Sequence, residues 1–203
     1  MTLLLLIRHG MTDAVGRRLS GRLPGVSLNA EGCAQAERLG ARLASVPLHA
    51  IYCSPLERAQ ETARVIAASH ALDARVRPSL TDIDFGAWSG KALSELHGEP
   101  EWTAFNTQRG SCRPPGGEHI AEVQARMVTE LVQLGAQHPG QTIAVVGHAD
   151  PLRVAIAFLC GAPLDSSQRL ELAPGSLSVL RLQVGDAVLL RLNDTGADLP
   201  ELR

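Results

Sequence analysis

The stretch that most constrains the fold is the aliphatic run near the start, TLLLLIRHG, which ends on an arginine and a histidine. Because Leu3 to Ile7 show no polar alternation, the run predicts a strand covered on both faces, as in the parallel sheet of an α/β protein. It is too short to span a bilayer and lacks the charged lead-in and small-residue cleavage site of a signal peptide. Arg8 and His9 are therefore expected at the carboxyl end of a buried strand.

Composition indicates one globular domain of ordinary size. The chain has 203 residues, 45% of them hydrophobic, so we expect a single domain over 1–203 with a small cap or insertion around 82–117. Nineteen basic and twenty-one acidic side chains give a net charge of −2, which lacks the broad positive field that nucleic acid or an anionic membrane needs. Because the sequence shows no C-x-x-C pair, its cysteines are expected to be reduced. Because it shows no targeting segment, the protein is expected to be cytoplasmic.

Strand and helix patterns alternate along the chain. Apolar strands are predicted over 3–7, 48–53 and 142–146, and helices over 30–44, 56–69, 118–137 and 151–161. Short helices are expected near 91–98 and 100–105 in the cap, and a terminal hairpin over 176–182 and 187–193. This alternation favours an α/β fold with an open, largely parallel sheet.

Two loops carry signals for the start of a helix. Asn29 is placed to cap the helix over 30–44. Ser54 is expected to cap the helix over 56–69, with Pro55 in its first turn. Arg58 then falls in the first turn of that second helix.

Basic side chains are expected to meet where the parallel strands end. The first strand delivers Arg8 and His9, the second delivers Ser54 and nearby Arg58, and the third delivers His148. In open parallel sheets ligands bind at this edge, where helix N-termini also point their positive dipole ends. Two guanidiniums and two imidazoles suit an anion with several oxygens, so a phosphoryl group is the predicted ligand.

The motifs that carry these residues resemble those of a known family, the histidine phosphatase superfamily of phosphoglycerate mutase-like proteins. They occur in the family's order and approximate spacing: LIRHGMT, SPLERAQETA, LTDIDFGAWSG, PPGGE and VVGHAD. The resemblance covers residue 3 to about residue 160 and points to the phosphatase branch. It implies an α/β three-layer sandwich with a mostly parallel central sheet flanked by helices.

The resemblance also implies an activity, that of a metal-independent phosphatase of the histidine acid phosphatase type with no cofactor. Its substrate would be a small phosphorylated metabolite, hydrolysed through a phosphohistidine. Relatives dephosphorylate phosphoglycerates, phosphoserine, sugar phosphates, α-ribazole phosphate and nucleotides, so the choice among phosphomonoesters stays open.

Roles for the site residues follow from the chemistry of phosphoryl transfer and agree with the family's pattern. A neutral imidazole is a good nucleophile, so His9 is expected to form the phosphohistidine. Arg8, Arg58 and His148 are expected to stabilise charge on the phosphoryl oxygens. Thr12 either adds a hydroxyl to the phosphate site or stabilises the loop, and both interpretations stay open.

The leaving alkoxide needs a general acid, and Asp82 is the candidate. Relatives commonly carry glutamate at this position, so the side chain here is one carbon shorter. Asp84, two residues away, and Glu118, in the PPGGE loop, could substitute for it if the local backbone differs from the family's usual one, and they remain alternatives.

Other features leave further alternatives open. Val15 stands where relatives that contact phosphate often carry asparagine, and the stretch before PPGGE is short; both favour hydrolysis over a mutase. Mutase-type transfer and a non-catalytic phosphate-binding module remain the competing interpretations. A metal site at the DID sequence is disfavoured because the apolar strand that should precede such a site is missing.

The surroundings of the site are less constrained by the sequence. Five arginines are candidates for lining the substrate approach: Arg17, Arg18, Arg22, Arg109 and Arg113. Trp88 and Trp102 are expected to pack in the core. An edge strand in the terminal hairpin leaves a homodimer open.

Overall fold

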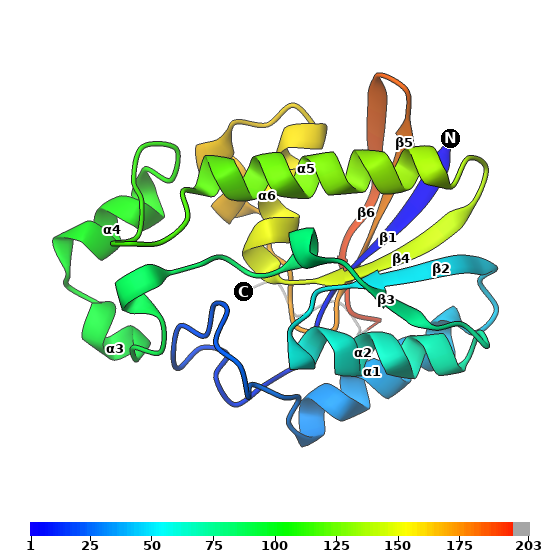
Figure 1. The fold of residues 1–203 in the computed structure, drawn as a ribbon, viewed down its shortest axis with the longest axis horizontal. Coiled ribbons are helices and arrows are strands. Elements are labelled where there is room, and N and C mark those ends of the chain that lie inside the picture. Colours follow the sequence, from blue (N-terminus) through cyan, green and yellow to red (C-terminus); the bar gives the residue numbers. More distant parts are fainter. Residues whose placement is uncertain (197–203) are drawn as a thin grey trace, which may run out of the picture.

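A central sheet organises the part of the chain that the computed structural model describes, residues 1–196 (Figure 1). Its strands lie in the order β3-β2-β4-β1-β5-β6. Their bounds are Thr2–Arg8 (β1), Leu48–Cys53 (β2), Ala74–Val76 (β3), Thr142–Gly147 (β4), Leu177–Gln183 (β5) and Asp186–Asp194 (β6). The first four strands of that order run parallel, whereas β5 is antiparallel to β1 and β6 is antiparallel to β5. The predicted mostly parallel sheet and terminal hairpin are confirmed.

Helices cover both faces of this sheet and make three layers (Figure 1). One face carries α1 (Ala30–Leu43) and α2 (Glu57–Ala68), and the other carries α5 (Ile120–Gln137) and α6 (Ala149–Leu159). Two short helices, α3 (Leu93–Leu96) and α4 (Pro100–Thr107), lie beyond one end of the sheet. No helix among residues 1–196 is both long enough and apolar enough to cross a membrane.

The first strand is buried on both faces, as its unbroken apolar run predicts. Leu4 and Leu6 pack in the core beneath α5 and α6. Leu5 and Ile7 alternate with them and pack in the core beneath α1 and α2. Because both faces are apolar, β1 is held in the centre of the sheet with its polar end, Arg8, at the carboxyl edge.

The two predicted helix caps have different outcomes. Asn29 caps α1 as predicted, since its side chain accepts a hydrogen bond of 2.9 Å from the N–H of Gly32. The prediction for Ser54 is wrong: α2 begins at Glu57, and its N-cap residue is Leu56, which makes no side-chain cap bond. The Ser54 hydroxyl accepts a hydrogen bond of 3.2 Å from the N–H of Leu56. The same hydroxyl is also hydrogen-bonded to His148.

A close backbone contact fixes the loop that follows His9. A Cβ atom placed on Gly32 would overlap the carbonyl oxygen of Met11, and one placed on Gly10 would lie 2.5 Å from the carbonyl oxygen of Gly32. The first turn of α1 can therefore approach this loop only because both residues are glycine.

Replacing Gly32 by alanine is expected to destabilise the protein by about 2–3 kcal/mol, because the added methyl group overpacks the contact. Gly40→Ala in the same helix is the matched control, since its Cβ would make only ordinary contact, 3.5 Å from Val65. That control should be neutral or slightly stabilising. Urea denaturation measures both, and equal free energies of unfolding for the two variants would contradict this account.

The segment 82–117 packs against the loop that follows β1. Leu19 exchanges backbone hydrogen bonds with this segment, donating to Lys91 (3.0 Å) and accepting from Gly90 (2.8 Å). The two tryptophans of segment 82–117 pack as predicted. Trp88 is buried. Trp102 is partly buried against the same core, and its ring meets that of Trp88 edge to face with 5.4 Å between the ring centroids.

The short strand β3 was not predicted, because three residues with a central arginine show no strand pattern.

Candidate active site

The sheet register brings the predicted phosphate ligands to one edge. Arg8 lies opposite Gly147 in the β1–β4 pair, and Cys53 lies opposite Val146 in the β2–β4 pair, so the three strands end together. A cavity of about 190 Å³ lies at this edge. Its polar and charged lining comprises Arg8, His9, Thr12, Arg18, Ser20, Arg58, Asp82, His148 and Asp150. Of the residues that the sequence placed at three strand ends, Arg8, His9, Arg58 and His148 share this cavity, whereas Ser54 does not line it.

His9 is a buried, neutral imidazole with a defined tautomer. Its Nδ1 lies 2.7 Å from the carbonyl oxygen of Gly10, which can only accept, so Nδ1 carries the proton. Burial, reinforced by the charges of Arg58 and Arg8, lowers the pKa of His9 to about 3. The unprotonated Nε2 therefore keeps its lone pair at neutral pH, as a nucleophile must.

Arg58 connects His9 to the rest of the site. Its Nε donates to His9 Nε2 at 3.3 Å, and its Nη2 donates to the carbonyl of Gly21 at 2.8 Å and to the Asp82 carboxylate at 3.1 Å. The side chain is only 2% exposed, so these bonds are made away from solvent. One guanidinium thus orients both the imidazole and the carboxylate.

Three buried nitrogens of the cavity lack a hydrogen-bond partner among residues 1–196: Arg8 Nε, Arg58 Nη1 and His148 Nδ1. Buried polar groups are almost always paired, because leaving one unpaired costs about 1–3 kcal/mol. Two of these atoms are guanidinium donors, whose charge favours an anion. All three belong to residues that line the cavity, so an oxyanion is the kind of ligand that suits their chemistry.

His148 is held by the serine that was predicted as a helix cap. Its Nε2 lies 2.7 Å from the Ser54 hydroxyl, and its Nδ1 lies 3.6 Å from the Asp82 carboxylate. Burial, with the nearby charge of Arg58, lowers the pKa of His148 well below its ordinary value. Ser54 therefore orients His148 and does not cap α2, a role that local sequence signals could not reveal.

Among the three candidate general acids, only Asp82 lies in the cavity. Burial raises the pKa of its carboxyl, although the charge of Arg58 and the N–H of Ile83 oppose this. Asp84 is turned to the N–H of Gly86 at 2.9 Å. The two carboxylates of the DID sequence thus have different partners, unlike a pair of metal ligands.

Glu118, the third candidate, is occupied by two arginines. Arg22 donates to its carboxylate at 2.8 Å, and Arg126 donates to it at 2.8 and 3.0 Å. It does not line the cavity. The geometry therefore favours Asp82 over both alternatives.

The loop after β1 forms part of the cavity wall. Thr12 is buried and lines the cavity, and its carbonyl accepts from the N–H of Val15 at 3.2 Å. The Thr12 hydroxyl as a phosphate ligand stays a prediction. Val15 also lines the cavity, so this part of the wall offers an apolar side chain.

Of the five arginines expected near the approach, only Arg18 lines the cavity. The other four do not line it, and three of them, Arg22, Arg109 and Arg113, pair with carboxylates. Arg109 lies 3.2 Å from Asp150, and Arg113 lies 2.5 Å from Glu122.

Asp150 is a cavity residue that the sequence did not assign to the site. Burial alone would raise its pKa, but Arg109 and Arg153 hold the pKa below its ordinary value. Arg153 lies three residues further along α6, 3.3 Å away. The VVGHAD motif contains Asp150, but its pairing with Arg109 of the cap depends on tertiary structure.

Comparisons with known proteins find similar proteins along nearly the whole chain. The family model of the histidine phosphatase superfamily (branch 1) matches residues 4–195. The bifunctional protein Rv2228c of Mycobacterium tuberculosis is 36% identical over 200 residues, which are 96% of this chain and 54% of that protein. The chain therefore spans about half the length of that relative.

Two further proteins match along nearly their whole length. The adenosylcobalamin/alpha-ribazole phosphatase of Escherichia coli is 31% identical over 193 residues, covering 94% of this chain and 95% of the relative. The solved structure of Bacillus stearothermophilus YhfR superposes with a TM-score of 0.90 at 29% identity, covering 96% of this chain and 98% of that one.

Proposed function

Because the chain belongs to the histidine phosphatase superfamily (branch 1), as its motifs predicted, we propose that it is a metal-independent phosphatase acting on a small phosphomonoester. The observation that carries this proposal is the set of three unpartnered buried nitrogens around the neutral His9. A phosphoryl group bound there would satisfy the donors and stand beside the nucleophile. The name of the E. coli relative makes alpha-ribazole phosphate one candidate substrate.

The first step forms a phosphohistidine. His9 Nε2 attacks phosphorus, the bond from phosphorus to the ester oxygen breaks, and protonated Asp82 gives its proton to the leaving oxygen. Arg8, Arg58 and His148 stabilise the charge on the equatorial oxygens. The raised pKa of Asp82 favours the protonated acid that this step requires.

The second step releases phosphate. Water attacks the phosphohistidine, the Asp82 carboxylate takes a proton from that water, and the bond between nitrogen and phosphorus breaks. His9 returns to its neutral form because its pKa of about 3 disfavours protonation. No cofactor takes part in either step.

The test is release of phosphate from 4-nitrophenyl phosphate and benzyl phosphate in the presence of EDTA. Turnover that is unchanged by the chelator supports a metal-independent phosphatase. Loss of turnover with EDTA would revive the metal interpretation, and no release under any condition would favour the mutase or the phosphate-binding module.

The pH profile of kcat/KM is expected to fall on the alkaline side as Asp82 loses its proton, and to show no fall near neutrality from protonation of His9. Because His9 stays neutral down to about pH 3, protonation of the nucleophile should not reduce kcat/KM around pH 6. Because Asp82 acts as an acid, kcat/KM for benzyl phosphate should fall as the pH rises through its raised pKa. In Asp82→Asn that alkaline limb should disappear, while the ionisation of the substrate affects both enzymes equally. A limb that persists in Asp82→Asn would contradict the assignment.

A further inference from the structure

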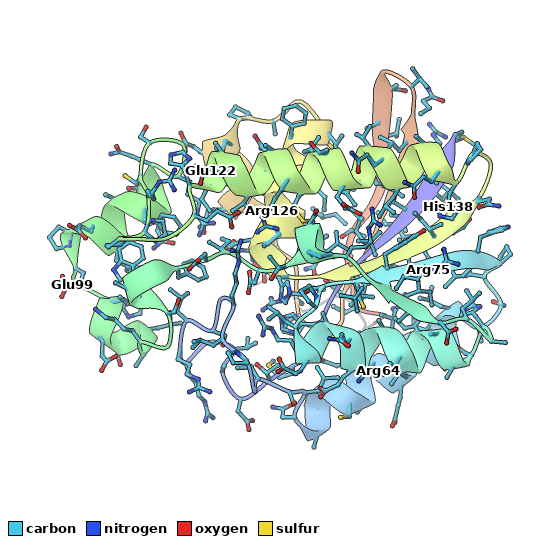
Figure 2. All side chains as sticks on the ribbon, in the orientation of Figure 1. Arg64, Arg75, Glu99, Glu122, Arg126 and His138 are labelled. Atoms are coloured by element: carbon cyan, nitrogen blue, oxygen red, sulfur yellow. The ribbon has the colours of Figure 1, made fainter. Side chains whose placement is uncertain are left out.

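Arg126, labelled on α5 in Figure 2, bonds to the backbone of the segment that carries Asp82. Its Nη1 donates to the carbonyls of Ser79 at 2.7 Å and Thr81 at 2.8 Å, and its Nη2 donates to the carbonyl of Asp82 at 3.1 Å. Its Nε and Nη2 also bind Glu118, at 2.8 and 3.0 Å. One side chain thus makes contacts to three carbonyls and a carboxylate.

A second arginine bonds to the same carbonyl and to the same carboxylate. Arg22, in the loop after β1, donates from Nε to the Asp82 carbonyl at 2.9 Å and from Nη2 to Glu118 at 2.8 Å. The Asp82 carbonyl therefore accepts from two guanidiniums, and Glu118 bridges them. Arg126 and Glu118 have side-chain exposures of 18% and 14%, so their pair is better shielded from water than a surface pair.

The backbone position matters because the aspartate side chain is short. One methylene separates the carboxyl from its Cα, so the distance from Asp82 Oδ2 to Arg58 (3.1 Å) and to His148 (3.6 Å) depends directly on where the backbone lies. Residues 81–84 belong to no strand or helix, so no regular ladder of hydrogen bonds holds them. A displacement of about 1 Å in a reacting group can cost roughly 10²-fold in rate.

We propose that Arg126, with Glu118 and Arg22, is a positioning residue that keeps Asp82 at the place from which it protonates the leaving group. This role rests on the proposed function. Arg126 makes no hydrogen bond to His9 or to the unpartnered nitrogens, and its charge is one of several that lower the pKa of His148. Its removal should therefore impair leaving-group protonation more than attack by His9.

The test compares two substrates of similar size. Benzyl alkoxide is a poor leaving group that needs a proton, whereas 4-nitrophenolate leaves readily without one. Arg126→Gln is expected to lower kcat for benzyl phosphate by roughly 10- to 100-fold and for 4-nitrophenyl phosphate by less than about threefold. Arg77→Gln is the matched control, because Arg77 also pairs with a carboxylate of α5, Glu130 at 2.6 Å, away from Asp82. It should leave both rates unchanged.

A second arm shows whether Arg126 acts through Asp82. In an Asp82→Asn background, Arg126→Gln should cause no further loss on benzyl phosphate, because residues that act as a unit are non-additive. Glu118→Gln, which keeps the side chain's shape, is expected to give a smaller loss with the same selectivity, and it provides the test if Arg126→Gln does not fold.

The outcomes separate the two proposals. Equal losses on both substrates, or losses that add to those of Asp82→Asn, would overturn the positioning role in an otherwise active phosphatase. If the wild type releases phosphate from neither substrate, the proposed function fails, and the positioning role fails with it.

Discussion

His9→Ala is expected to abolish phosphate release, lowering kcat by at least about 10⁴-fold, the scale on which loss of a nucleophile acts. The reason is that Nε2 is the buried, unprotonated atom that faces Arg58 at the cavity. Phosphate release from 4-nitrophenyl phosphate measures the effect. Because this substrate has a good leaving group, its loss of hydrolysis reports on nucleophilic attack and not on the general acid.

The matched control for that variant is His97→Ala, because His97 is exposed and lies outside the cavity. It should keep wild-type activity. Circular dichroism should show that His9→Ala remains folded, since the side-chain contacts of His9 are confined to Gly10 and the site itself. Retention of activity within about tenfold of wild type would exclude His9 as the nucleophile.

Arg58→Lys is expected to lower kcat/KM by roughly 10²- to 10³-fold, although it keeps the positive charge. A lysine ammonium cannot reproduce the planar fork that serves His9, Asp82 and the unpartnered Nη1 position together. Steady-state kinetics with both aryl and benzyl phosphates measures the loss, which should appear with both substrates. The reason is that Arg58 bonds to both His9 and Asp82.

Arg64→Lys provides the control on the same helix. Arg64 is exposed on α2, as Figure 2 shows, and its guanidinium donates to Gln60 at 2.9 Å. That variant should behave as wild type. If Arg58→Lys were as active as Arg64→Lys, a positive charge alone would suffice at this position. The proposal that the guanidinium must bond to His9 and Asp82 together would then be wrong.

The sheet could be predicted largely because its central strands are unbroken apolar runs. The segments 3–7 and 142–146 have no polar alternation, which is typical of strands buried on both faces. By contrast, Ala74–Val76 pairs only with β2 at the sheet edge, and three residues are too few to show a period. Edge strands of this length are set by tertiary pairing.

The site could be predicted where it depends on strand ends. Arg8, His9 and His148 follow apolar strands directly, and parallel strands deliver such residues to one edge. The general acid was ambiguous because Asp82, Asp84 and Glu118 differ only in tertiary partners, which the sequence does not display.

The supporting contacts could not be predicted. Ser54 carries a valid local cap signal, but a bond to a histidine 94 residues away uses its hydroxyl. Arg126 lies in the middle of a helix, where an arginine usually indicates a solvated face. Its contacts with Ser79, Thr81 and Asp82 join segments more than 40 residues apart.

The central claim is a phosphohistidine on His9, and trapping that species tests it most directly. Wild-type protein would be mixed with 4-nitrophenyl phosphate, quenched in base within the first turnover, digested and analysed by mass spectrometry. The account predicts one phosphoryl group on the peptide that contains His9, stable in base, lost in acid and absent from His9→Ala. An active enzyme that carries no phosphoryl group under these conditions, or that carries it on another residue, would contradict the account.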